Sequence, residues 1–114
     1  MGARSGLGEF EQLVLLAVLQ LGDTAYGPEI SGLLEEAANR EVSRGALYSS
    51  LERLERKGLL QWRIDATRSG QSGTPLRRFT VTRKGVQALR DHRQALLTLW
   101  NGLEKTLAPN RGRS

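Results

Sequence analysis

The sequence predicts a mainly α-helical (α+β) protein of the winged helix-turn-helix class, with three helices and a β-hairpin wing followed by one long C-terminal helix. Three observations predict this class. Apolar side chains recur at helical spacing in three segments within residues 9–57. From residue 60 to 81 the pattern changes to the alternation of two β-strands that flank a polar loop. From residue 86 onward an apolar seam with 3-4 spacing is typical of a helix that pairs with another helix.

The first two helices are expected at residues 9–21 and 27–39. The first begins with acidic residues, which suit the positive end of a helix dipole, and Gly22 stands just past its end. Leucines and valines surround it almost completely, so we expect it to be the central buried helix. Pro28 opens the second helix, where a missing N–H has no cost. Only residues 23–26 connect the two.

A third helix is expected between Ser43, a suitable N-cap, and Gly58, which suits a left-handed helix end. Leu47, Leu51 and Leu54 form its single apolar stripe, and its opposite face is polar and basic. Two helices joined by a short link, the second with a basic outer face, match a helix-turn-helix, whose second helix enters a DNA groove. DNA recognition is therefore the leading hypothesis.

The segment after the third helix predicts a β-hairpin. Leu60, Trp62 and Ile64 alternate with polar residues, which is a strand pattern. Residues 68–74 are expected to form a flexible polar loop. The β-branched and aromatic content of residues 76–81 favours a returning strand. The pair would form a wing with a basic tip.

The last helix is expected to begin at the cap Thr82 and to run to about residue 107. Its seam comprises Val86, Leu89, Arg93, Leu96, Trp100, Leu103 and Leu107. A small winged-helix body cannot cover so long an apolar helix, so we expect the seam to be the interface of a homodimer. The chain then divides into a DNA-binding domain of residues 1–81, a dimerisation helix of residues 82–108 and a disordered basic tail of residues 109–114.

Charge is distributed unevenly along the chain. Residues 1–42 carry a net charge of −5, residues 43–84 carry +7 and residues 85–114 carry +3. Positive charge is thus concentrated on the third helix and the hairpin. A concentrated basic region is typical of proteins that bind a polyanion, although a solvated basic surface is the simpler alternative.

The composition argues against an enzyme. The chain has no cysteine and one histidine, His92, so it cannot hold a disulfide framework or a cysteine-based zinc site. It has no glycine-rich phosphate loop and no evident pair of catalytic carboxylates, so we expect no metal and no cofactor. The apolar run 13–21 lacks a cleavage-like end and is shorter than the roughly 20 residues that span a bilayer. We therefore expect a cytoplasmic protein that does not bind membranes.

Three stretches, LVLLAVLQLGDTAYGPEI, SRGALYSSLERLERKGLL and SGTPLRRFTVTRKG, resemble the PadR family, the phenolic-acid-responsive class of bacterial winged-helix transcriptional regulators. The resemblance spans about residues 7–107. It implies a homodimeric transcription factor, usually a repressor, with a C-terminal dimerisation helix. The single helix after the wing is similar to the shorter of the family's two size classes. The wing of the family often ends in two aromatics, where this chain has Phe79 followed by Thr80.

On the third helix, five residues are candidate DNA contacts. Arg44, in the first turn, can chelate the O6 and N7 atoms of guanine or contact a phosphate. Gly45 permits close approach to DNA or close packing. Tyr48 borders the apolar stripe and has two interpretations. Its hydroxyl could reach a DNA phosphate, which the resemblance favours, or the residue could be a core tyrosine. Ser49 and Arg53 lie on the polar face, although Arg53 could instead pair with neighbouring glutamates.

Further contacts are expected outside this helix. Tyr26 and Gly27 resemble the family's Tyr-Gly motif, and the N–H groups at that helix start could bind a phosphate. In the wing the expected contacts are Arg68, Gln71, Arg77 and Arg78. The last two are adjacent on a strand and point to opposite faces, so only one of them is expected to face DNA.

Trp100 has two interpretations. The simpler is a core residue of the dimer interface. The other is an aromatic wall of a ligand site between subunits, which some relatives of the family possess and which would bind a small hydrophobic or aromatic effector.

The expected function is a sequence-specific, double-stranded-DNA-binding repressor that acts as a homodimer on a pseudo-palindromic operator and is released by a ligand. The alternative is a winged helix that serves as a protein-interaction and dimerisation module without specific DNA binding. The charge of residues 43–84 favours the first, because a protein partner would not need so many cations.

Overall fold

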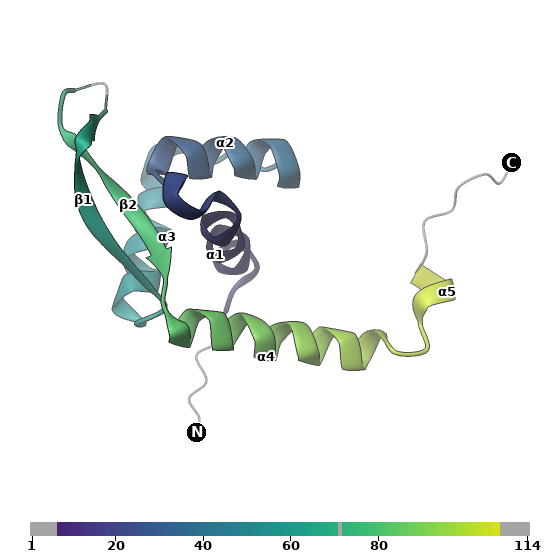
Figure 1. The fold of residues 1–114 in the computed structure, drawn as a ribbon. Coiled ribbons are helices and arrows are strands. Elements are labelled where there is room, and N and C mark those ends of the chain that lie inside the picture. The colour runs from purple at the N-terminus through teal and green to yellow at the C-terminus, as the bar shows by residue number, and fades with distance from the viewer. Residues whose placement is uncertain (1–6, 71, 108–114) are drawn as a thin grey trace, which may run out of the picture.

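The computed structural model describes residues 7–70 and 72–107. Its elements are α1 (Glu9–Leu21), the short 3₁₀ helix η1 (Gly22–Thr24), α2 (Gly27–Ala38), α3 (Arg44–Arg56), β1 (Leu60–Ser69), β2 (Pro75–Val81), α4 (Arg83–Trp100) and α5 (Glu104–Leu107). The three helices and the antiparallel hairpin form one head, and α4 leaves the foot of the hairpin and extends beyond that head (Figure 1). The predicted winged-helix class is confirmed.

The predicted helix caps are present. The Ser43 hydroxyl accepts the N–H of Ala46 at 3.1 Å, and the Thr82 hydroxyl accepts the N–H of Gly85 at 3.0 Å. Gly58 has a φ of 78°, in the left-handed region that glycine favours. These three positions therefore fix where α3 begins, where it ends and where α4 begins.

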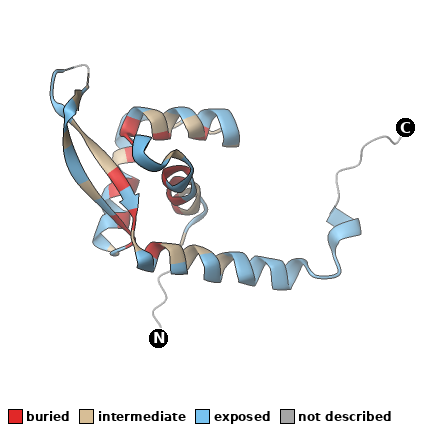
Figure 2. Ribbon diagram, viewed as in Figure 1, coloured by how far each residue is buried: buried red, intermediate tan, exposed pale blue. Residues whose placement is uncertain are grey.

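The core lies between α1 and the surrounding elements of the head (Figure 2). The side chains less than 10% exposed that pack there are Val14, Leu15, Ala17 and Val18 from α1, Ile30 and Leu34 from α2, Leu47, Leu51 and Leu54 from α3, and Ala25, Leu59, Leu60, Phe79 and Val81. The central position predicted for α1 is correct on this side only, because Leu16 and Leu19 are each 46% exposed on its other side.

The hairpin is longer than the sequence pattern predicted. Pairing runs from Leu60 opposite Val81 to Asp65 opposite Leu76, shifts register, and resumes with Ser69 opposite Pro75. The loop expected to begin at residue 68 therefore begins two residues later. The irregularity falls where the Asp65 carboxylate accepts the backbone N–H of Thr67, a local bond that interrupts the ladder without ending the strand.

The predicted continuous C-terminal helix to residue 107 is wrong. Helix α4 ends at Trp100, because Asn101 leaves the helical region at ψ 124° and Gly102 adopts a left-handed φ of 85°. Leu103 and Leu107 of the predicted seam therefore lie beyond the break. The predicted basic tail, residues 109–114, lies outside the described residues.

The first turns of α4 pack on the head, where Val86 and Leu89 are half-buried. From residue 93 onward every described side chain of α4 is exposed, so this part of the helix has no cover within the chain (Figure 2). Among the described helices none is long and apolar enough to cross a membrane.

Two helical glycines should respond oppositely to alanine. A Cβ at Gly85 would collide with the backbone carbonyl of Leu59 and come within 2.6 Å of a Val81 methyl group, whereas a Cβ at Gly32 meets nothing within 4 Å. We expect Gly85→Ala to lower the free energy of unfolding by about 2 kcal/mol. Gly32→Ala should raise it by about 0.7 kcal/mol. Urea denaturation at equal protein concentration measures the free energy of unfolding of both variants. A Gly85→Ala variant with an unchanged free energy of unfolding would contradict the close packing.

Candidate nucleic-acid interface

Helix α3 presents its polar side to solvent. Its apolar stripe is buried against the core, so Arg44, Gly45 and Ser49 are exposed by helical geometry. A Cβ atom added at Gly45 would meet no atom of another part of the chain within 4 Å, so a partner can approach the backbone there. The exposed first turn of α3 has the shape and the polarity that groove binding requires.

Tyr48 packs against the start of α2. A Cβ at Gly27 would lie 2.9 Å from the ring carbon that bears the Tyr48 hydroxyl and would collide with that hydroxyl oxygen. Gly27 therefore leaves the space that the tyrosine ring fills. The guanidinium of Arg44 lies 6.0 Å from the centre of the same ring, and Arg44 forms no ion pair with any described residue.

Two adjoining clefts separate α3 from the wing. One, of about 560 Å³, opens at the N-terminal ends of α2 and α3 and is lined by Gly27, Pro28, Ser31, Arg44, Leu47, Tyr48, Arg68, Ser69, Gly70 and Leu76. The other, of about 340 Å³, lies farther along the wing and shares Arg44, Tyr48, Gly70 and Leu76 with the first. Its α3 side also includes the acidic residue Glu52. Its wing side includes Arg77. We call this second cleft the α3–wing groove.

Arg77 and Arg78 point to opposite faces of β2, as their adjacency predicted. The Arg77 guanidinium lies 4.4 Å from the centre of the Trp62 ring and makes no ion pair within the described chain. Arg78 is 3.4 Å from the Asp23 carboxylate. Only Arg77 of the two lines the α3–wing groove.

Arg68 and Tyr26 belong to a network that ties the wing to α2. The Arg68 guanidinium is 3.0 Å from a Glu29 carboxylate oxygen and lies 4.3 Å from the centre of the Tyr26 ring. Tyr26 is 6% exposed, and its hydroxyl donates to the Asp65 carboxylate. The structure thus brings Tyr26 and Arg68 together but places the tyrosine hydroxyl inside the molecule. Gln71 lies outside the described residues.

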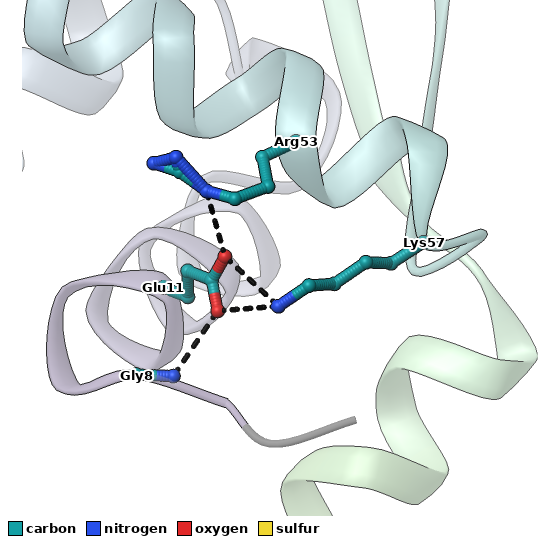
Figure 3. A network of polar contacts seen from close by, with 4 residues as sticks. All are labelled: Gly8, Glu11, Arg53 and Lys57. Carbon is teal, nitrogen blue, oxygen red and sulfur yellow. Dashed lines mark hydrogen bonds and ion pairs between the residues drawn. The ribbon is translucent and has the colours of Figure 1, made fainter. Parts of the chain in front are cut away.

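Arg53 is held by a carboxylate from α1 (Figure 3). Its Nε lies 3.2 Å from Glu11, whose two oxygens also accept from Lys57 at 2.9 and 3.1 Å and from the N–H of Gly8 at 3.1 Å. Burial alone would raise the pKa of Glu11, but the hydrogen bonds from Lys57 and Gly8 outweigh it and lower that pKa. Arg53 therefore pairs with a residue 42 positions away, not with the neighbouring glutamates.

Asp65 is the one acidic residue of the hairpin, residues 60–81, and its pKa is strongly lowered. Hydrogen bonds from the Thr67 hydroxyl and from the Tyr26 hydroxyl, with a further bond from the Thr67 backbone, hold its pKa at about 2, below the ordinary 3.8. The bond to Asp65 in turn raises the pKa of Tyr26 above its ordinary value. The pair is a polar link between β1 and the residue that precedes α2.

Sequence reasoning missed several participants in these networks, among them Trp62 and Glu11, as well as Asp23, Glu29, Lys57 and Asp65. The sequence pattern places Trp62 in a strand and Glu11 in the first turn of a helix, and neither position by itself indicates a partner. The sequence does contain a signal that Glu11 needs a partner. It lies at the start of a helix that is expected to be buried, and a carboxylate on such a helix requires a cation or a hydrogen-bond donor. No local pattern identifies Trp62, because its partner Arg77 is on the other strand.

The predicted dimer residues divide into two groups. Val86 and Leu89 are half-buried against the chain's own core. The others are exposed: Leu96 at 45%, Trp100 at 42%, Leu103 at 43% and Leu107 at 50%, together with Arg93.

Comparison with known proteins identifies similar chains. Residues 15–91 match the model of the transcriptional regulator PadR-like family. A solved PadR family transcriptional regulator from Eggerthella lenta is 30% identical, with 90% of this chain and 88% of that chain covered and a TM-score of 0.63. A PadR-like transcriptional regulator from Bacillus cereus has a TM-score of 0.66 at 22% identity, with 88% and 92% covered. No curated protein matches the chain.

The Tyr26–Asp65 link predicts a pH dependence. Because the folded-state pKa of Asp65 is lowered, its carboxylate stabilises the fold above about pH 4, and that contribution is lost as the pH falls from about 4 toward 2. Tyr26→Phe removes one donor, so the pKa of Asp65 should rise toward 3.8. NMR titration of the Asp65 carboxyl measures it. Tyr48→Phe is the control, and an equal shift in both variants would contradict the link.

Proposed function

Because this chain belongs to the transcriptional regulator PadR-like family, whose members are DNA-binding regulators and not enzymes, we propose that it is a sequence-specific repressor that reads DNA with α3 and its wing. One observation supports this most directly. Arg44 and Arg77 line the same α3–wing groove from opposite sides, and neither forms an ion pair with a described carboxylate, although Glu52 of α3 also lines the groove. Two guanidinium groups without an ion-pair partner beside an exposed helix turn suit a polyanion with grooves.

The proposed contacts fall into two classes. Arg44, Gly45 and Ser49 would enter the major groove, with Arg44 in position to read a guanine edge. Tyr48 and Arg77 would contact phosphates, with Gln71 at the wing tip as a further contact. These phosphate contacts fix orientation rather than sequence.

The remaining candidates would affect DNA binding without contacting DNA directly. Tyr26 and Gly27 support the wing and the Tyr48 ring from inside the molecule. Arg53, Arg68 and Arg78 each lie within 3.4 Å of a carboxylate oxygen, so part of their positive charge is offset within the chain. We propose that these three contribute to the electrostatic field more than to individual contacts.

We further propose a homodimer, with residues 1–81 as the DNA-binding part and residues 82–108 as the dimerisation part. Leu96 and Trp100 leave apolar surface uncovered on α4, and Leu16 and Leu19 do so on α1. A two-fold dimer would set the two α3 helices in successive major grooves, about 34–36 Å apart, on a pseudo-palindromic operator.

The regulation we propose is repression with release by an effector. Trp100 would form an aromatic wall between subunits for a small hydrophobic or aromatic ligand, which would change the angle between the heads. A repressor of this class acts on chromosomal DNA, which would place the protein in a bacterial cytoplasm. Tryptophan emission during titration with flat aromatic compounds tests the ligand site, and unchanged emission at high concentration excludes it.

A second candidate is a winged helix that serves as a protein-interaction and dimerisation module. The uncovered apolar surface of α4 and α1 is compatible with it. It does not explain why Arg44 and Arg77, which form no ion pair within the described chain, line the same groove. The two functions differ in salt dependence, because phosphate contacts release counterions and apolar contacts do not.

The proposed function predicts specific binding to DNA from upstream of the protein's own gene. We expect a labelled native fragment to bind more tightly than a scrambled one, with affinity that falls as salt rises. Arg44→Ala should weaken the native fragment about tenfold more than the scrambled one, as the loss of a base contact requires.

Arg56→Ala is the matched control for Arg44→Ala, since it removes one exposed arginine from the other end of α3. It should weaken both fragments alike and only slightly. Equal losses on both fragments with Arg44→Ala would make Arg44 a phosphate contact. Absence of binding to either fragment at low salt would favour the protein-interaction module.

The dimer proposal predicts that Leu96→Asp produces monomers, because a carboxylate at this seam position would lose its hydration in the interface, a cost that Arg93 three residues earlier would only partly offset. Sedimentation velocity measures the change. Gln94→Asp places the same charge on an exposed polar position of α4 and should leave the dimer intact. A monomeric unmodified chain at micromolar concentration would contradict the proposal.

A further inference from the structure

One face of the wing pairs an arginine with a tryptophan. Trp62 lies opposite Phe79 and Ile64 lies opposite Arg77 in the hairpin register, so Trp62 and Arg77 are diagonal neighbours on the same face. The Arg77 guanidinium lies over the indole, 4.4 Å from its centre. Tryptophan is the best aromatic partner for a cation, and a guanidinium within about 6 Å of its face is attracted by the ring.

The indole is anchored by apolar packing. Trp62 is half-buried against the core of the head. Its ring N–H is buried and has no hydrogen-bond partner among the described residues. A leucine would fill this apolar position without burying an unpaired donor. What the tryptophan adds is a broad aromatic face, and Arg77 lies on that face.

An aromatic partner leaves the positive charge of an arginine available to a third molecule, whereas a carboxylate offsets that charge. Glu29 lies 3.0 Å from Arg68, and Asp23 lies 3.4 Å from Arg78, so a carboxylate offsets part of the charge of each of these arginines. The neutral indole orders Arg77 without cancelling its charge. An ordered guanidinium that keeps its full charge can bind a phosphate with less loss of side-chain entropy.

We propose that Trp62 is a positioning residue of the DNA interface, which holds the Arg77 guanidinium ordered and charged at the α3–wing groove. Trp62 acts on DNA through Arg77. This role rests on the proposed function, because it requires that the groove beside Arg44 and Arg77 receives DNA.

A double-mutant cycle on the full chain tests the coupling, with a labelled duplex from upstream of its own gene as the probe. Arg77→Gln should weaken binding about tenfold and make the slope of log affinity against log salt shallower by about one. Trp62→Leu should weaken binding about fourfold without changing that slope, because the charge of Arg77 remains. The double variant should bind like Arg77→Gln alone, within about twofold.

Two further variants control the cycle. Ile64→Ala removes an exposed side chain from the same face, directly opposite Arg77, and should change affinity by less than about twofold. Trp62→Phe keeps an aromatic ring, so it should lose less than Trp62→Leu and remains informative if the leucine variant unfolds.

If the losses of affinity of Arg77→Gln and Trp62→Leu multiply in the double variant, the positioning role is overturned. The same holds if Ile64→Ala loses as much affinity as Trp62→Leu. Neither result contradicts the proposed function. If the unmodified chain binds no DNA, the proposed function fails and the role of Trp62 fails with it.

Discussion

The burial of one face of α3 is the constraint on which the rest of the structure depends. Leu47, Leu51 and Leu54 are at most 2% exposed, and each contributes roughly 1.5–3 kcal/mol on burial. An exposed ion pair contributes about 0–1 kcal/mol, so packing and not surface charge sets the rotation of the helix. With that face inward, helical geometry turns Arg44 and Ser49 outward. The face that we propose to meet DNA is thus a consequence of what the core requires.

Contacts between the acidic and basic parts of the chain divide the arginines into those that form an ion pair and those that do not. The first 42 residues carry a net charge of −5, and three of their carboxylates, Glu11, Asp23 and Glu29, each pair with an arginine from α3 or the wing. These pairs brace the head and reduce the positive potential near them. Arg44 and Arg77 form no ion pair within the described chain, and the Arg77 guanidinium lies 4.4 Å from the centre of the Trp62 ring. Net charge along the sequence therefore overstates the number of cations available to a partner.

Sequence reasoning predicted most of the fold and less of the site, for a physical reason. Caps such as Ser43 and Gly58 and the stripe of α3 are local patterns, and local patterns fix helices and strands. The break at Asn101 was missed because an apolar seam can continue past a glycine that ends the helix. The partners of Arg53 and Arg77 were missed because each pair joins different elements, and the distance between elements is set by packing that no short segment encodes.

The junction between the head and α4 determines how the two parts can move. The Thr82 hydroxyl donates to the carbonyl of Gly58 at 2.7 Å, and the Thr82 N–H donates to the carbonyl of Leu59 at 3.0 Å. Gly85 packs so closely on Leu59 that no side chain fits between them. Helix α4 is therefore bound at its start to the end of α3 and to the foot of the hairpin (Figure 1). In the homodimer that we propose, these contacts would couple the orientation of the first turn of α4 to α3 and the wing together, so a change in the angle between the two copies would move both of the elements proposed to face DNA.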